Sequence, residues 1–182
     1  STFARRISIN NSEAKEHKYI EHPLPPLFDE RSKVLILGSF PSIKTREAGF
    51  FYGHPQNRFW PMISSLLGVS PELKATEPER ARRVMLERGI AIWDSIAACE
   101  IVGSSDSSIR DVVPTDLGPI FSTAQIRHVF CNGAASYRYF KKYQNLPPGV
   151  EVSRLPSTSP ANAATSLDGL IEAWSELLKY LD

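Results

Sequence analysis

Four short apolar runs constrain the fold of this chain more than any other feature. They occupy residues 34–37, 90–93, 126–131 and 150–155, and each is followed by small or polar residues. Apolar runs of this length are typical of strands buried on both faces of a parallel sheet. The last run alternates apolar and polar residues, which is typical of an edge strand.

Helix-like patterns fill the intervals between these runs. Segment 59–67 places its apolar residues on one helical face. Thr76 and Glu79 form a capping box, which predicts a helix from this point to Arg88. Two further helices are predicted, over 134–143 and after a cap at Thr165.

Strands that alternate with helices predict βαβ units. The expected architecture is an α/β fold, a three-layer α/β/α sandwich with a central, mostly parallel four-stranded sheet. A length of 182 residues fits a single domain. Residues 1–31 are polar and then proline-rich, so we expect them to form an N-terminal arm. No export signal or membrane span is evident, which favours a cytoplasmic protein, nucleoid-associated in a prokaryote.

The composition argues against several classes of protein. The 21 Lys and Arg residues exceed the 20 Asp and Glu residues by one, which argues against a binder that works by bulk positive charge. Cys99 and Cys131 are far apart, so zinc fingers, iron–sulfur clusters and redox dithiols lack their ligands. Glycine-rich nucleotide cradles and the Gly-x-Ser-x-Gly elbow do not occur. His128 lies within a strand-like run and is expected to be a hydrogen-bonded core residue.

Ligands of parallel α/β sheets bind beyond the carboxyl ends of the strands. This rule selects the segments that follow the four apolar runs. All four are rich in small and polar residues, which allow a ligand to approach the backbone closely; they are 38–42, 94–95, 132–133 and 156–160.

Segment 49–60 is both aromatic and polar, which is unusual for a plain loop. One interpretation places its Phe and Trp side chains in the core and lets Asn57 cap the following helix. The other interpretation gives Tyr52 and Asn57 a role in function. For the aromatic residues, the sequence pattern does not decide between these two interpretations.

Segments 38–42, 49–60, 93–109 and 155–163 together resemble the uracil-DNA glycosylase superfamily, and most closely its hypoxanthine-DNA (deoxyinosine) glycosylase branch. The resemblance extends over most of residues 33–181. It implies a monofunctional DNA glycosylase of base excision repair, a hydrolase that flips out a deaminated base and cleaves its N-glycosidic bond. Hypoxanthine is the expected base. The alternatives are a uracil- or mismatch-specific glycosylase of the same fold and an inactive nucleic-acid-binding module.

Two positions depart from other branches of the superfamily. Ser39 stands where those branches carry an Asp or Asn, and Leu155 stands where some carry a catalytic His. The hypoxanthine branch is similar in both respects, and the resemblance implies that it relies on the Asn of His-Pro-x-Asn, here Asn57. Ser39 is assigned a supporting catalytic role.

Base recognition and DNA contact are also implied by the resemblance. Tyr52 would stack on the flipped base, Phe40 would form the opposite wall, and Asn132 would read the base edge, unless Asn132 serves only as a turn or helix cap. Hydroxyl groups suit neutral contacts to phosphate. The predicted DNA contacts are Ser42, Lys44, Ser157, Thr158 and Ser159, with Lys44, Arg46 and Arg58 as a positive rim.

The implied partner is damaged DNA, bound by a monomer without metal or cofactor. Asp94, Glu100 and Asp106 match no metal-binding spacing, and Asp94 has the alternative of capping a turn. Because the predicted contacts are mostly neutral, salt should weaken DNA binding less steeply than for a strongly basic protein.

Overall fold

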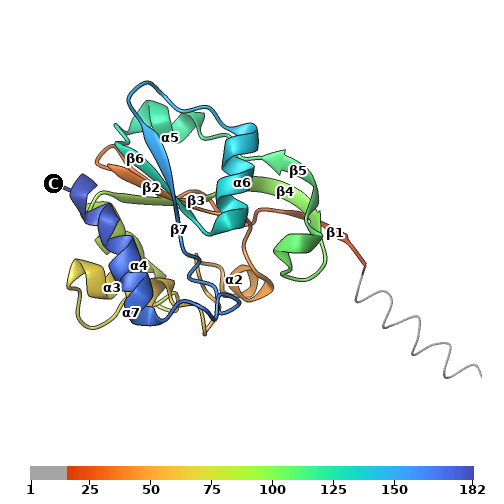
Figure 1. The fold of residues 1–182 in the computed structure, drawn as a ribbon, viewed down its shortest axis with the longest axis horizontal. Helices are drawn as coiled ribbons and strands as arrows, with labels where there is room; N and C mark the ends of the chain where they lie inside the picture. Colours follow the sequence, from red (N-terminus) through yellow and green to blue (C-terminus); the bar gives the residue numbers. More distant parts are fainter. Residues whose placement is uncertain (1–15) are drawn as a thin grey trace, which may run out of the picture.

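A four-stranded parallel sheet forms the centre of the computed structural model, which describes residues 16–182 (Figure 1). Its strands are, in spatial order, β3 (Ile90–Asp94), β2 (Val34–Gly38), β6 (His128–Asn132) and β7 (Glu151–Leu155). Every residue of β2 and β3 is buried, as expected for strands covered on both faces. The predicted sheet is confirmed, and β7 lies at its edge as the alternating pattern indicated.

Helices cover both faces of this sheet, which confirms the three-layer architecture. In Figure 1, α3 (Phe59–Leu67), α4 (Pro78–Glu87) and α7 (Leu167–Trp174) lie on one side. The helices α5 (Gly118–Thr123) and α6 (Ala134–Tyr143) lie on the other. The short α2 (Ile43–Ala48) follows β2, and the 3-10 segment η2 (Ser175–Tyr180) continues α7. None of the helices in residues 16–182 is long and apolar enough to cross a bilayer.

Two predicted helix starts are wrong. Thr76 does not cap α4, because this helix begins at Pro78 with Glu77 before it and without a side-chain cap. Proline favours the first helical position, and it sets the start here. The last helix is capped by Ser166, whose hydroxyl accepts from the Gly169 N–H at 3.1 Å, whereas the Thr165 hydroxyl accepts from Asn162.

A second, antiparallel sheet was not predicted from the sequence. It consists of β1 (Lys18–Glu21), β4 (Ile96–Ile101) and β5 (Arg110–Pro114), with the 3-10 turn η1 (Asp106–Ser108) between β4 and β5. The strand β4 follows β3 after only Ser95, so no loop between them marks β4 as a separate strand. Four of the five residues of β5 are exposed, which removes the apolar pattern that would reveal it.

The prediction of an arm over residues 1–31 is wrong for residues 16–31. The strand β1 pairs with β4, and Leu27, which is 1% exposed, forms a bridge with Ile92 of the parallel sheet. The remainder of the predicted arm lies outside the described residues. The segment that precedes β2 is therefore part of the packed fold and brings its side chains toward the carboxyl end of β3.

Candidate functional site

A small pocket lies beyond the carboxyl ends of β2, β3 and β6, at the edge of the sheet that the parallel topology selects. It offers about 120 Å³ to water-sized molecules. Pockets for drug-sized ligands measure ~300–1,000 Å³, so this one suits a single small planar group. Nine of the ten predicted site residues line it, and they are Ser39, Phe40, Ser42, Tyr52, Asn57, Asn132, Ser157, Thr158 and Ser159.

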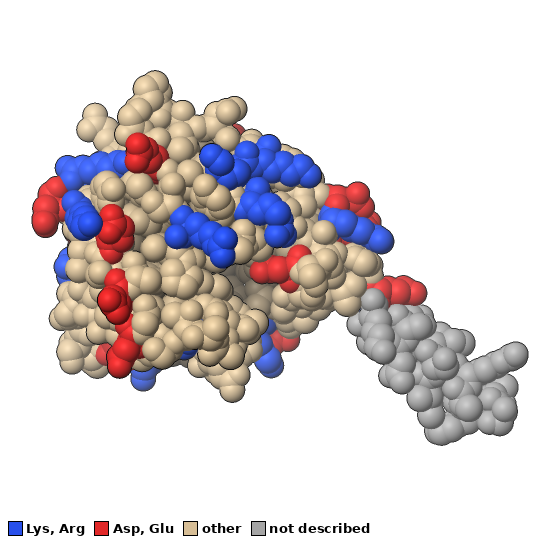
Figure 2. Space-filling view, in the orientation of Figure 1, with Lys and Arg blue, Asp and Glu red and all other residues tan. Residues whose placement is uncertain are grey.

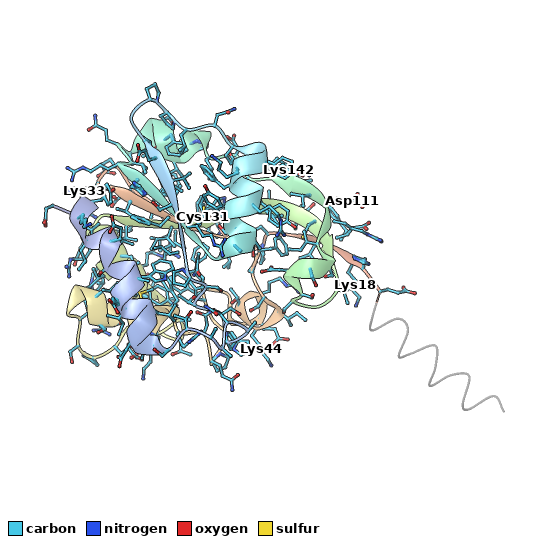
Figure 3. All side chains as sticks on the ribbon, in the orientation of Figure 1. Lys18, Lys33, Lys44, Asp111, Cys131 and Lys142 are labelled. Atoms are coloured by element: carbon cyan, nitrogen blue, oxygen red, sulfur yellow. The ribbon has the colours of Figure 1, made fainter. Side chains whose placement is uncertain are left out.

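Lys44 is the predicted site residue that does not line the pocket. It lies on α2 near the outside of the molecule (Figure 3), and its ammonium is 3.7 Å from the exposed Glu47 carboxylate. Exposed ion pairs of this kind contribute ~0–1 kcal/mol to stability, so Lys44 can exchange Glu47 for another partner.

Asn57 is held by the start of α3. Its side-chain carbonyl accepts a hydrogen bond from the backbone N–H of Phe59 at 2.9 Å. The N-cap of α3 is Arg58, without a side-chain cap, so Asn57 binds the first helical N–H from the position before the cap. This bond fixes the direction of the amide within the pocket. A carbonyl oxygen has two lone pairs, so Oδ1 can accept one more hydrogen bond.

The aromatic residues around Asn57 belong to the core. Phe50, Phe51, Phe59 and Trp60 are each no more than 3% exposed. The interpretation of these four side chains as core plugs is confirmed. Packing of this density gives Asn57 a rigid support.

Arg58 ties α3 to the loop that follows β7. Its guanidinium donates to the carbonyls of Ser159 at 3.0 Å and Asn162 at 2.7 Å, and also to that of Thr165. The prediction that Arg58 forms a positive rim for DNA is wrong, because its hydrogen bonds are directed into the protein. Arg58 instead fixes the position of Ser157–Ser159 relative to Asn57.

Asn132 and Thr158 bind each other. The Asn132 amide nitrogen donates to the Thr158 hydroxyl at 3.0 Å, and the Thr158 backbone N–H donates to the Asn132 carbonyl at 3.0 Å. Thr158 is fully buried, so its hydroxyl does not fit the predicted contact to phosphate. Asn132 retains one N–H for a ligand, less than the full amide edge that the prediction gave it. The left-handed turn belongs to its neighbour Gly133, at φ 94°.

Tyr52 presents a neutral phenol to the pocket. Its ring stacks on Phe59 with 4.0 Å between centroids and 25° between planes. Burial, followed by the effect of the nearby Asp94 carboxylate, raises the pKa of the Tyr52 phenol above its ordinary value. The Asn132 amide acts on this pKa in the opposite direction, but its bonds go to Thr158, and the phenolic oxygen has no hydrogen-bond partner among residues 16–182.

Two carboxylates in the pocket were not assigned a site role from the sequence. The Ser39 hydroxyl donates to Asp106 Oδ1 at 3.0 Å. Burial of the carboxylate atoms raises the pKa of Asp106, while the Ser39 hydrogen bond and Arg138 oppose this effect. Asp94 does not cap a turn through its side chain, which instead binds His22. Asp94 is the last residue of β3 and Asp106 the first residue of η1. The place of Asp94 at the end of a predicted strand was a sequence signal, but the spacing of the two carboxylates matches no known motif.

The remaining acidic and histidine residues have structural partners. Glu100 lies outside the pocket lining and pairs with Arg110 at 2.7 Å. His128 is 4% exposed and is 2.7 Å from the Ser153 hydroxyl, which confirms the prediction of a core histidine. Within residues 16–182, no group of three His, Cys, Asp or Glu side chains is arranged to hold a metal ion. Metal independence stays a prediction.

The helix-covered parallel sheet and the polar pocket at its carboxyl edge define an α/β protein with its ligand site at the strand ends. Residues 25–178 match the family model of the uracil DNA glycosylase superfamily. The chain therefore belongs to the uracil DNA glycosylase superfamily. It is a DNA glycosylase, a hydrolase that acts on N-glycosyl bonds of damaged DNA.

Three relatives illustrate this membership. The chain is 30% identical over 156 residues to a protein of Methanosarcina barkeri named hypoxanthine DNA glycosylase, covering 85% of this chain and 96% of the relative. A protein of the same name from Methanosarcina acetivorans is 30% identical over 162 residues, covering 88% and 99%. The solution NMR structure of a Methanosarcina acetivorans protein described as a uracil DNA glycosylase superposes with a TM-score of 0.69 and 26% identity, covering 92% of this chain and 98% of that one.

Proposed function

We propose that this chain removes hypoxanthine from DNA by hydrolysing the N-glycosidic bond of deoxyinosine. The observation that carries the proposal is Asn57, whose carbonyl is fixed in the pocket by the Phe59 N–H. Ser39, which by the resemblance stands where other branches carry an Asp or Asn, also lines the pocket. The two relatives named hypoxanthine DNA glycosylase support the choice of base. Extrusion of the nucleotide costs ~2–4 kcal/mol and is least costly at a mismatch, such as inosine opposite thymine.

The proposed reaction is attack of a water molecule on C1′ of the extruded nucleotide. The free lone pair of Asn57 Oδ1 orients this water, which lowers the barrier through position rather than basicity. Ser39 holds Asp106 at the same pocket, and a carboxylate is a better proton acceptor than a neutral amide. The bond from C1′ to the purine breaks, and its electron pair leaves with the base. No lysine lines the pocket, so we expect no covalent Schiff-base step.

Recognition of the base is assigned to the aromatic walls of the pocket. Phe40 lines it as the face on which the base stacks, while Tyr52, whose ring is stacked on Phe59, contributes its hydroxyl. Stacking of a base on an aromatic ring is worth ~1–3 kcal/mol. Asn132 contributes its remaining N–H, and its main task is to hold Thr158 in place.

The DNA backbone is proposed to run past the two loops beside the pocket. Ser42, Ser157 and Ser159 line its wall and offer neutral hydroxyls to phosphate oxygens, with Lys44 beyond them on α2. Figure 2 shows further Lys and Arg side chains gathered over α6 and the edge strand β7. On these two elements the basic residues are Arg138, Lys141, Lys142 and Arg154. They replace Arg58 in the expected positive rim.

The proposal takes the chain as one domain that acts as a monomer without metal or cofactor. These points and a cytoplasmic, nucleoid-associated location stay predictions. Sedimentation of the protein and excision in the presence of EDTA measure two of them directly.

A panel of lesions tests the function. Labelled duplexes that carry inosine, uracil or xanthine are incubated with the protein and then cleaved at abasic sites with alkali. We expect strand breaks first at inosine. Breaks at uracil alone would establish a uracil-specific enzyme instead. Retardation of DNA on a gel without any breaks would indicate a binding module. Trapping of a covalent adduct by borohydride would contradict the expected direct hydrolysis.

A further inference from the structure

Two oxygen atoms converge at the floor of the pocket above Gly38. Gly38 and Asp94 are paired neighbours at the ends of β2 and β3. A Cβ atom built on Gly38 would lie 2.3 Å from Asp94 Oδ1 and 3.4 Å from the Tyr52 hydroxyl oxygen. The glycine therefore leaves space that these two polar groups occupy from opposite sides. Any side chain at this position would displace the Asp94 carboxylate.

His22, from the segment after β1, holds the other oxygen of Asp94. The distance from His22 Nε2 to Asp94 Oδ2 is 2.5 Å, and the two side chains are 3% and 8% exposed. The backbone N–H of Leu24 donates to His22 Nδ1 at 3.1 Å, so this nitrogen carries no proton. The ring is therefore the neutral tautomer with its proton on Nε2, which donates to Asp94. Trp93 stacks on the same ring at 4.3 Å.

The consequence is a carboxyl group with one oxygen bound by His22 and the other available. Asp94 Oδ2 is taken by His22, while Oδ1 makes no hydrogen bond with any of residues 16–182. The Tyr52 hydroxyl beside it is buried and also without a partner among these residues. Buried polar groups are nearly always hydrogen-bonded, so the unpaired Tyr52 hydroxyl, with the available Oδ1 of Asp94 beside it, indicates a ligand that supplies the partners.

We propose that Asp94 Oδ1 and the Tyr52 hydroxyl read the lactam edge of the extruded base. Hypoxanthine presents an N1–H donor and an O6 acceptor, and Asp94 accepts from the first while Tyr52 donates to the second. Adenine presents an acceptor at N1 and a donor at N6, so its N1 lone pair would face the carboxylate. His22 is the positioning residue that sets the direction of Asp94. This inference rests on the proposed function and names the groups that give it selectivity.

The recognised feature is the product of deamination itself. Uracil and guanine carry the same N–H and C=O pair, whereas cytosine and adenine carry the reverse arrangement. Asp94 and Tyr52 therefore distinguish a deaminated base from its parent amine, and the size and shape of the pocket select among lactams. A site built to hydrogen-bond a particular polar group discriminates strongly against a base that lacks this group, because the buried groups of the site are then left unpaired.

The central test is Asp94→Asn. The His22 Nε2–H group donates to the oxygen of the new amide. The NH₂ group of this amide therefore faces the base. The variant presents a donor where the wild type presents an acceptor. We expect excision of inosine to fall by ~10- to 150-fold, the range for a lost charged hydrogen bond. We also expect free adenine to inhibit the variant better, relative to free hypoxanthine, than it inhibits the wild type.

Three further variants separate recognition of the base from folding. His22→Gln keeps a donor near Asp94, and His22→Phe removes it while keeping a ring against Trp93. We expect kcat/KM for inosine to fall by ~10-fold in the Phe variant and to be largely restored in the Gln variant. Tyr52→Phe keeps the stacking ring and loses only the hydroxyl, with an expected loss of ~2- to 10-fold. Thermal unfolding of each variant establishes that it is folded.

The outcomes distinguish this inference from the proposed function. If the wild type excises inosine and Asp94→Asn keeps the same preference for hypoxanthine over adenine, the inference is overturned and the function stands. If the wild type excises uracil and not inosine, the proposed function fails. The same variant is then compared on uracil and cytosine, where reversal of preference supports the inference and an unchanged preference rejects it.

Discussion

The two ends of the parallel sheet differ in how their polar side chains are satisfied. The amino end carries a groove of about 480 Å³, larger than the pocket of about 120 Å³ at the carboxyl end. The groove is rich in charge, but Lys33 donates to the Leu181 carbonyl and Arg88 to that of Leu67. The pocket instead keeps the Tyr52 hydroxyl unpaired. Available hydrogen-bonding capacity marks the functional end better than size or charge.

The largest effect is expected at the carboxyl end, from Asn57→Ala. Loss of the carbonyl that orients the water should reduce turnover of inosine by ~1,000-fold, the upper range for one preorganised polar group. The same change removes the hydrogen bond to Phe59 and should cost ~1 kcal/mol of stability. Single-turnover excision and thermal unfolding measure the two effects. Asn57→Asp is the control, because its carboxylate can still accept the hydrogen bond from Phe59. If the Ala variant loses stability but keeps full turnover, Asn57 serves only to hold the start of α3.

Asp106→Asn should have the next largest effect. Loss of the proton acceptor is expected to reduce turnover by ~100-fold at neutral pH. A base acts in its ionised form, and burial raises the pKa of Asp106, so wild-type activity should fall as the pH is lowered through this raised pKa. The variant should lack this acid limb. If the activity of both proteins falls over the same acidic pH range, a group other than Asp106 causes the fall.

Stability provides the control for Asp106. A carboxyl whose pKa is raised by folding is favoured in its protonated form in the native state. The ionised form therefore adds nothing to stability at neutral pH, and Asp106→Asn should not lower the melting temperature. A clear decrease would indicate that the hydrogen bond with Ser39 is structural.

Tyr52→Ala should reduce excision by ~10- to 100-fold through loss of the hydroxyl and of the pocket wall that the ring forms. The stack on Phe59 is lost as well, so the melting temperature should decrease. Binding of an inosine duplex by fluorescence anisotropy separates the two effects. A lower melting temperature with unchanged lesion binding would place Tyr52 in the core alone.

The smallest effect is expected at the amino end. Lys33→Met keeps the aliphatic stem and removes the hydrogen bond to Leu181, which should cost about 1 kcal/mol. Lys33 and Lys44 lie at opposite parts of the molecule (Figure 3), and excision should be unchanged. A loss of activity without unfolding would show that the amino end takes part in the reaction and would break the contrast between the two ends.

The sequence predicted the elements that carry a strong repeating pattern. The parallel strands are buried on both faces, so their apolar runs stand out, and the strand-end rule then selected the segments of the pocket. The second sheet was not predicted because β4 follows β3 after a single residue, without a loop that marks a new strand, and because β5 is mostly exposed.

The hydrogen bonds within the site could not be predicted. His22 and Asp94 are 72 residues apart, and Arg58 reaches carbonyls about 100 residues away. No local pattern encodes which of several possible partners a polar side chain selects. For that reason Asn132 and Thr158 were assigned to DNA, although they bind each other.

The place of His22 affects how a shortened form of this protein should be built. The match to the family begins at residue 25, three positions after the histidine that holds Asp94. A fragment cut at that boundary would retain the whole parallel sheet and Asn57, but β1 and His22 would be gone. Such a fragment would lack the strand that pairs with β4 and the group that orients Asp94, so we expect it to be both less stable and less selective for a deaminated base. A shortened form should therefore begin before β1.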